Sequence, residues 1–379
     1  MGGPAQRLPP ISTVGCKRMR IAGAGQKICF SLAILCVAGL GLPAQRNRKS
    51  TEEPKTQVLP LPPELPMALE ADTATLDFHI SPLLRTGGLA AQIRQSLNDL
   101  IRDTKGERIV KLRAFVAGAG DARRVQAQAA ELFTEKKLPL PTVTVIQVGA
   151  LETEAAQVVI EAVVSTRRTL NPNGLAFFSG QAGKTYPQAA QRLEQSAKLA
   201  GVSPGRILRC TCFTAEIENA AGLRSMLQAA FPQAAINVVQ PLRDAPTEST
   251  LCEAVGQLTQ ARPEGPVVLL KNARATLVNS PKLVFTGLQL TFGNFLDDAQ
   301  EAVVRLQRAA SALQPVEAPV EVNAFALDAY AGSAVRKMTA VPLSTFTVQN
   351  IEGLPSIDAT AGIEAILAPN VSAPVTIAQ

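Results

Sequence analysis

The chain has 379 residues, of which 46% are hydrophobic and 18% are charged, proportions that are typical of globular domains and exclude a fully disordered chain. Aromatic residues make up only 4% and tryptophan is absent, which argues against a base-stacking surface for single-stranded nucleic acid. Eight of the 37 basic residues and none of the 31 acidic ones lie in positions 1–50, so the formal net charge of +6 belongs to the N-terminus. The rest of the chain is slightly acidic, and no basic face for nucleic acid is expected.

Residues 1–44 have the pattern of an export signal. The basic segment KRMRIAGAGQK precedes a 15-residue apolar run, ICFSLAILCVAGLGL, and the small-residue sequence LPAQ. Because a membrane-spanning helix needs roughly 20 apolar residues, we predict cleavage after Ala44 and a periplasmic or secreted protein. An uncleaved anchor and a start at Met19 are the alternatives. Five prolines between residues 54 and 66 predict an extended linker over 45–73.

From about residue 74 the chain repeats itself. The segments 90–119, 189–216 and 297–330 each combine an amphipathic helix pattern with an alternating strand, and Phe115, Phe213 and Phe325 hold the same place in them. Each unit reads ββαβαββ, with opening hairpins expected in VVSTRRTLNPNGLAFFSG for the second unit and PVVLLKNARATLVNSPKLVFTG for the third. We therefore predict an α+β protein with three tandem domains over 74–167, 168–262 and 263–370, followed by a tail over 371–379.

One segment imitates a phosphate-binding loop. Phe177–Thr185 reads FFSGQAGKT, but the position that should hold the first glycine is Phe178, and Gly180 comes two residues late. The backbone nest that cradles phosphates would therefore have the wrong size. We interpret the segment as a strand that ends in a turn before a helix.

Histidine and cysteine usage restrict the chemistry. His79 is the one histidine, which excludes a multi-histidine metal site, and we expect it on an edge strand. Cys210 and Cys212 lie two apart on a strand pattern and so share a face. Either could pair with Cys252 and leave a free thiol, or all three could be buried thiols. No metal and no cofactor are predicted.

Several short segments indicate a family. They are LAFFSGQAG and ILRCTCFTAEIENAAGLRSMLQAAFP in the second unit, LVFTGLQ and NIEGLPSIDATAGIEAILA in the third, and VIQVGALETEAAQVVIEAVV in the first. With them the chain resembles the RidA (YjgF) enamine/imine deaminases, also described as endoribonuclease L-PSP-like. Since members of that family form homotrimers with ligand clefts between subunits, the resemblance implies a chorismate-mutase-like fold and an intrachain pseudo-trimer that runs as a monomer.

The resemblance also implies site positions. The family's substrate-binding Arg corresponds to Val143, Ala234 and Phe346, and its catalytic Glu to Val159, Leu251 and Gly362. The retained Glu161, Glu253 and Glu364 match a second, structural glutamate of the family. The candidates that border the ligand clefts are Ser179, Gly180, Gln181, Thr286, Gly287 and Gln289. Lys111, Arg113 and Arg209 are expected on exposed strand faces, with a relocated anion site as the alternative.

The missing Arg and Glu favour a protein without catalytic residues. We therefore expect an exported pseudo-trimer that lacks deaminase activity and binds a small metabolite or a protein partner, touching a membrane only through an uncleaved signal. The alternative is a diverged deaminase of the 2-iminobutanoate/2-iminopropanoate type, or a hydrolase that uses the inter-domain clefts. Ribonuclease activity ranks last, because the sequence offers neither a histidine base beyond His79 nor a basic face.

Overall fold

The computed structural model describes residues 63–118, 120–244, 250–261, 265–313, 317–339, 345–369 and 376–378. These belong to one compact unit, Pro60–Gln379. The predicted export signal and most of the predicted linker lie outside the described residues, so both stay predictions. Within the described part, no helix combines the length and hydrophobicity needed to cross a bilayer.

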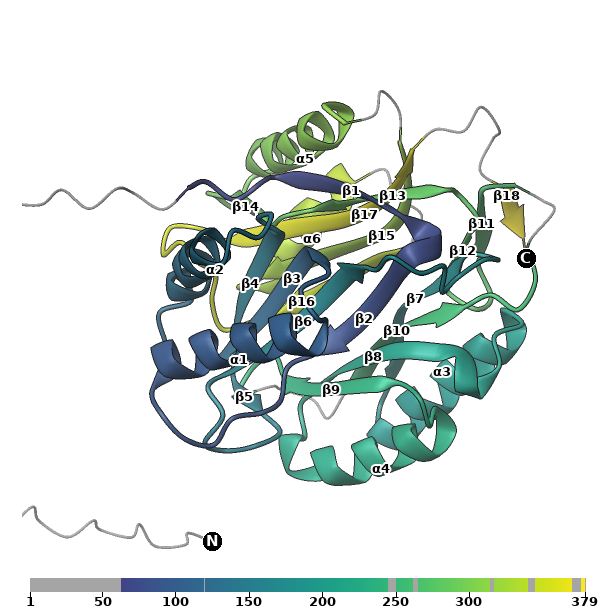
Figure 1. The fold of residues 1–379 in the computed structure, drawn as a ribbon, viewed down its shortest axis with the longest axis horizontal. Helices are drawn as coiled ribbons and strands as arrows, with labels where there is room; N and C mark the ends of the chain where they lie inside the picture. The colour runs from purple at the N-terminus through teal and green to yellow at the C-terminus, as the bar shows by residue number, and fades with distance from the viewer. Residues whose placement is uncertain are drawn as a thin grey trace, which may run out of the picture. The chain divides into compact units, whose positions relative to one another are not determined.

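Three sheets and six α-helices make up the described structure, so the α+β prediction is confirmed (Figure 1). The first sheet has the order β2 (Leu76–Ile80), β6 (Val158–Ser165), β3 (Arg108–Ala117), β4 (Thr142–Val148), with α1 (Leu89–Asp103) and α2 (Arg123–Glu135). The second has the order β7 (Leu175–Gly183), β10 (Thr250–Gln257), β8 (Ile207–Thr214), β9 (Ala235–Gln240), with α3 (Tyr186–Leu199) and α4 (Ala220–Ala230). The third has the order β13 (Lys282–Thr286), β17 (Ala361–Pro369), β15 (Glu317–Ala326), β16 (Phe346–Asn350), with α5 (Leu296–Ser311) and α6 (Ala329–Met338).

All three sheets share one topology. In each, the first two neighbouring pairs of strands are antiparallel and the last pair is parallel. The parallel pair is joined through the second helix, as parallel strands require a crossover connection. Six short strands extend this plan: β1 (Ala68–Asp72), β5 (Ala150–Leu151), the hairpin β11 (Val267–Leu270) and β12 (Ala275–Val278), β14 (Gln289–Thr291) and β18 (Thr376–Ala378).

The hairpin turns expected at NPNG and NSPK in the two opening segments are wrong, because each turn sequence lies in a passage between sheets; the second segment contains the β11–β12 hairpin instead. β6 ends in the first sheet and β7 begins the second, while β12 pairs with β7 and β13 joins the third sheet. β11 and β12, which were expected in the third domain, thus extend the second sheet. β1, expected within the linker, pairs with β13, and β18, expected in the tail, pairs with β11.

Hydrogen bonds connect the segments that pass from one sheet to another. Asn171 donates its side-chain amide to the carbonyls of Thr73 and Leu76, and Thr73 N–H donates to the carbonyl of Pro281. The segment between β1 and β2 therefore lies against the two passages between sheets, β6–β7 and β12–β13. A turn sequence predicts a chain reversal, but these tertiary contacts decide which sheet receives the next strand.

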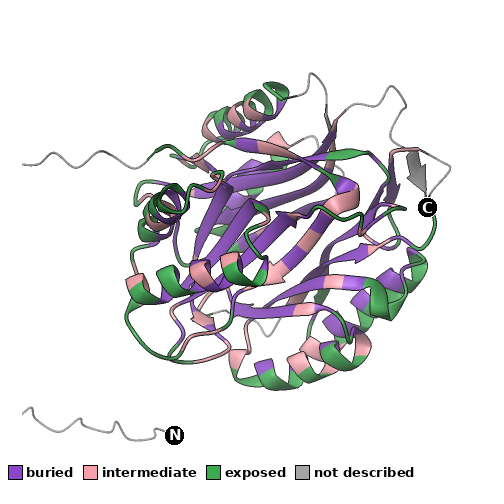
Figure 2. Ribbon diagram, in the orientation of Figure 1, coloured by how far each residue is buried: buried purple, intermediate pink, exposed green. Residues whose placement is uncertain are grey.

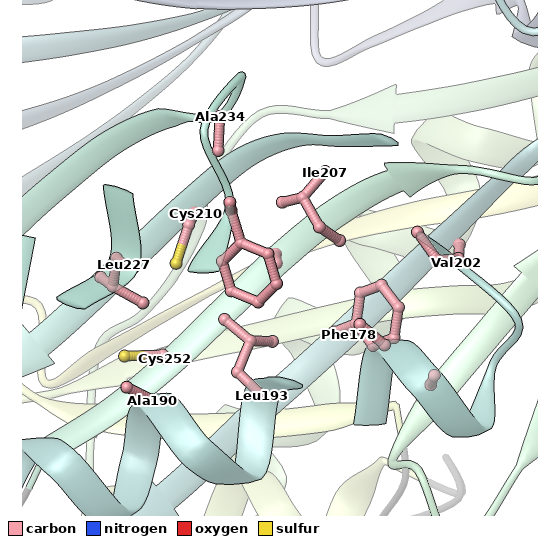
Figure 3. Packing of buried hydrophobic residues seen from close by; sticks show 14 of the residues in the cluster. Phe178, Ala190, Leu193, Val202, Ile207, Cys210, Leu227, Ala234 and Cys252 are labelled. Carbon is pink, nitrogen blue, oxygen red and sulfur yellow. The ribbon is translucent and has the colours of Figure 1, made fainter. Parts of the chain in front are cut away.

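Each sheet buries one face against its own helices. In α1, Ile93, Leu97 and Leu100 recur at helical spacing and are buried against β3 and β6. The second sheet repeats this arrangement, and Figure 3 shows Leu193 of α3 and Leu227 of α4 packed with Phe178 and Ile207. Figure 2 shows the same pattern across the fold, with buried strands and helices exposed on their outer sides.

The opposite faces of the three sheets pack together. Leu76 and Phe78, Leu175 and Phe177, and Leu283 and Phe285 repeat a Leu-x-Phe pattern at the first strand of each sheet and join one buried cluster. Phe115, Phe213 and Phe325 join a second cluster, with the Phe115 and Phe213 ring centroids 5.8 Å apart. The equivalence that the sequence predicted for these three phenylalanines is therefore confirmed. Each sheet is therefore covered by its helices on one face and by the other sheets on the opposite face.

Candidate functional site

Seven charged side chains meet where the inner faces of the sheets converge. They are Lys111, Arg113, Glu161, Arg209, Glu253, Glu321 and Glu364, each at most 6% exposed. We call this group the charged centre. By strand register, Glu161, Glu253 and Glu364 take the same place in their sheets, opposite Arg113, Thr211 and Asn323. The sequence interpretation of Lys111, Arg113 and Arg209 as exposed is wrong, because the face opposite the helices meets the other sheets and not water.

Arg113 joins all three sheets. Its Nη2 lies 2.7 Å from Glu161 Oε2 and also bonds Glu253, and its Nη1 lies 3.5 Å from Glu364 Oε1. Lys111 Nζ lies 2.6 Å from Glu364 Oε2. Because these carboxylates come from three different sheets, one guanidinium ties the sheets together.

The charges of the centre balance. Burial opposes ionisation of Glu364, but the charges of Lys111 and Arg113 outweigh it and lower the pKa of Glu364 to about 2. Burial and the neighbouring Glu253 charge raise the pKa of Glu321 to about 8. At neutral pH Glu321 is therefore mainly protonated, and three cations face three carboxylates. An additional buried charge without its own partner would be costly.

The charged centre has no room for a substrate. The cavity among its side chains measures about 20 Å³, space for about one water molecule. The contacts there join the sheets, and the space available for a small molecule lies in the clefts between them.

Three clefts open between the sheets. The first–second cleft, of about 380 Å³, is lined by Ile80, Ser81, Pro82, Leu83, Glu152, Val159, Arg224, Ala235, Ile236 and Asn237. The first–third cleft, of about 460 Å³, is lined by Gly120, Asp121, Ala122, Arg123, Gln147, Leu327 and the segment 352–357. The second–third cleft, of about 440 Å³, is lined by Ala182, Phe213, Ala215, Pro241, Leu242, Thr250, Leu251, Ala329, Gly332, Ser333, Arg336, Val348, Gln349 and Asn350.

The second–third cleft combines an apolar wall with polar groups from two sheets. Phe213 and Leu251 come from the second sheet, and Val348 from the third. Gln349 on β16 is 9% exposed, and its Nε2 has no hydrogen-bond partner among the described residues. A buried amide donor without a partner is unusual in a folded protein. The Gln349 residue itself is part of the cleft lining.

The predicted cleft residues lie elsewhere. Gln181 accepts a hydrogen bond from Ser196 of α3, and the hydroxyl of Thr286 accepts one from Ala365 N–H. Gly287 N–H donates to Met67, and Gln289 pairs with Ile363 in the sheet. Ser179, Gly180 and the other four candidates do not line any of the three clefts described above. No described group of histidine, cysteine, aspartate and glutamate is arranged to hold a metal.

The positions taken from the family are divided between cores and clefts. Val143, Ala234 and Phe346 are buried on the helix-covered faces of their sheets. Val159 lines the first–second cleft and Leu251 the second–third cleft, while Gly362 pairs with Phe325 within the third sheet. Sequence reasoning missed Arg336 and Gln349, which show no spacing motif. Only the meeting of two sheets brings them to one cleft.

The cysteine question has a definite answer. Cys212 on β8 is bonded to Cys252 on β10, and these residues are direct neighbours in the strand register. Cys210 is a buried free thiol within the core under α3 and α4 (Figure 3). Burial raises the pKa of Cys210 beyond the range of a reactive thiolate. His79 lies on edge strand β2 next to Asp77, as expected.

Neither a protein-family model nor a curated protein matches the chain. Solved structures that the chain matches include a chorismatase, with 12% identity over 78% of this chain and 99% of that chain and a TM-score of 0.24. They also include a cyanuric acid hydrolase, with 13% identity over 78% and 100% and a TM-score of 0.22. PurL of T. maritima complexed with FGAR has 10% identity over 78% and 73% and a TM-score of 0.26.

These findings overturn the predicted membership of the RidA family. No model of that family matches, and the similar structures named above are not RidA proteins. The expected function, a RidA-type pseudo-trimer that binds without catalysis, is corrected with it. The motifs behind the prediction have structural causes here. A Cβ on Gly180 would lie 2.6 Å from the end of the Leu251 side chain, which would have to move to make room, and Glu161, Glu253 and Glu364 serve the charged centre.

Proposed function

We propose that residues 68–369 are three concatenated units related by an approximate threefold axis through the charged centre. The shared strand order, the Leu-x-Phe pairs and the equivalent glutamates support this arrangement. Concatenation allows the three clefts to differ, whereas a symmetric homotrimer must keep them identical.

We further propose that the chain is an enzyme of small organic molecules, with its substrate site in the second–third cleft. The observation that carries this proposal is the buried, unpartnered amide donor of Gln349 in a cleft with an apolar wall. Pockets of this size with few convergent polar groups are the usual form of small-molecule sites.

The lining residues favour a hydrolytic reaction of a carbonyl compound. Gln349 Nε2 can donate to a carbonyl oxygen and stabilise the negative charge that develops there when water adds. The described lining holds no carboxylate, imidazole, amine or thiol. The protons that move during hydrolysis would therefore be transferred by the substrate or by water molecules. The reaction we propose therefore depends on polarisation and orientation of the substrate.

Filling the cleft should abolish binding. Ala182 is exposed at the second–third cleft, so Ala182→Phe is expected to place a ring in the cleft without disturbing the core. A panel of small cyclic amides and esters, screened by saturation-transfer NMR on the full chain, should give ligands whose affinity falls at least about tenfold in this variant. Ser356→Phe in the first–third cleft is the matched control and should leave them bound. Ligands that bind equally well to Ala182→Phe would refute the site.

A further inference from the structure

Each inter-sheet cleft contains one arginine from the second helix of a unit. Arg123 of α2 lies in the first–third cleft, Arg224 of α4 in the first–second cleft, and Arg336 of α6 in the second–third cleft. Each of the three clefts thus contains a guanidinium from a second helix, at a different position along each helix and in different surroundings.

Two of these arginines already hold a carboxylate of the chain. Arg224 Nε lies 2.7 Å and 2.9 Å from the two carboxylate oxygens of Glu152. Arg123 Nε lies 2.9 Å from Asp121 Oδ1. Planar guanidinium and carboxylate groups match each other in this way through paired hydrogen bonds. In both clefts the chain itself supplies the anion.

Arg336 has no such partner among the described residues. Its guanidinium carbon lies 5.2 Å from the centre of the Phe346 ring, which holds the side chain in place by a cation–π contact. None of the described residues lining this cleft is acidic. The second–third cleft therefore lacks the negative group that its two counterparts contain.

A second cation, which does not itself line the cleft, interacts with Arg336. Arg274, at the turn of the β11–β12 hairpin, has a buried Nε without a described partner. Burial lowers the pKa of Arg274, and the charge of Arg336 lowers it further, so the two cations repel each other. A bound anion would relieve that repulsion.

We infer that Arg336 binds a carboxylate group of the substrate in the second–third cleft. The inference rests on the proposed substrate site and adds the class of its ligand. Arg336 takes the anionic end, in the manner of Arg224 with Glu152, and Gln349 remains available to the reacting carbonyl. Both groups line the same cleft.

Three probes test this inference on the full chain: benzoate, its neutral analogue benzamide, and inorganic phosphate. Dissociation constants are measured by NMR titration for the wild type, Arg336→Gln and the matched control Arg123→Gln. We expect Arg336→Gln to raise the dissociation constant of benzoate at least about tenfold, as the loss of a charge-assisted hydrogen bond implies. The dissociation constant of benzamide should change less than about twofold. Arg123→Gln should change neither constant, and unaltered melting temperatures should show that both variants fold.

The outcomes separate the inference from the proposed site. Benzoate binding that does not depend on Arg336 overturns the inference. If, in addition, benzamide binds and Ala182→Phe blocks it, the substrate site stands. Phosphate that binds through Arg336 about tenfold more tightly than benzoate overturns the carboxylate assignment. If no probe binds in the second–third cleft, both the inference and the proposed site fail.

Discussion

Replacing Arg113 with methionine is expected to lower the free energy of unfolding by about 3–5 kcal/mol or more, the cost of breaking a buried ion pair from one side. Arg113 is 3% exposed and contacts Glu161, Glu253 and Glu364. Methionine fills much of its volume but leaves these carboxylates facing one another with fewer cations. The destabilisation should therefore exceed that of an ordinary core substitution.

Urea unfolding followed by circular dichroism at pH 7 measures this effect. Arg123→Met is the control, because the Arg123 side chain is 74% exposed, and it should shift the midpoint little. Adding Glu253→Gln to Arg113→Met should recover part of the loss, since it removes one unpaired charge. A midpoint for Arg113→Met equal to that of the wild type would show that the charged centre does not hold the sheets together.

Glu321 should make the protein less stable as the pH rises. Its folded pKa of about 8 lies above 4.5, the usual pKa of a glutamate in water, so between these pH values the folded state binds the proton and the unfolded state releases it. Stability from this group is then present below pH 4.5 and lost as the pH rises toward 8. Glu321→Gln, which stays neutral, should be more stable than the wild type by several kcal/mol at pH 9 and nearly equal to it at pH 4.

Unfolding curves of both proteins from pH 4 to 9 test the direction. Glu364→Gln supplies the contrast, because the folded pKa of Glu364 is about 2 and its ionised form is the stabilising one. That contribution is present above the unfolded pKa and lost as the pH falls. Glu364→Gln should therefore lower the free energy of unfolding most at neutral and high pH. A stability difference between Glu321→Gln and the wild type that does not grow with pH would exclude a protonated Glu321.

Local patterns predicted most of the elements correctly. The strand and helix around Phe177–Thr185 are β7 and α3, and the equivalence of Phe115, Phe213 and Phe325 appears as one buried cluster. These predictions succeed because hydrophobic spacing and turn residues act over a few positions.

Local patterns could not predict the charged centre or the sheet that each strand joins. Alternation assigns Arg113 and Leu112 to opposite faces of β3, and a lone strand suggests that the charged face meets water. Here that face meets two other sheets, whose carboxylates compensate the charge. Similarly, the sequence around Asn171 predicts a reversal, but the partner of the following strand depends on contacts with Thr73, far away in the chain.

By itself, the sequence indicated the six helices and the main strands and the recurrence of their pattern, because these follow from short-range periodicity that recurs along the chain. Only the tertiary structure decided which sheet each strand joins, that Arg113 is buried, and that Arg336 and Gln349 share a cleft. Those outcomes depend on side chains from different sheets meeting, and such long-range partners leave no local signal.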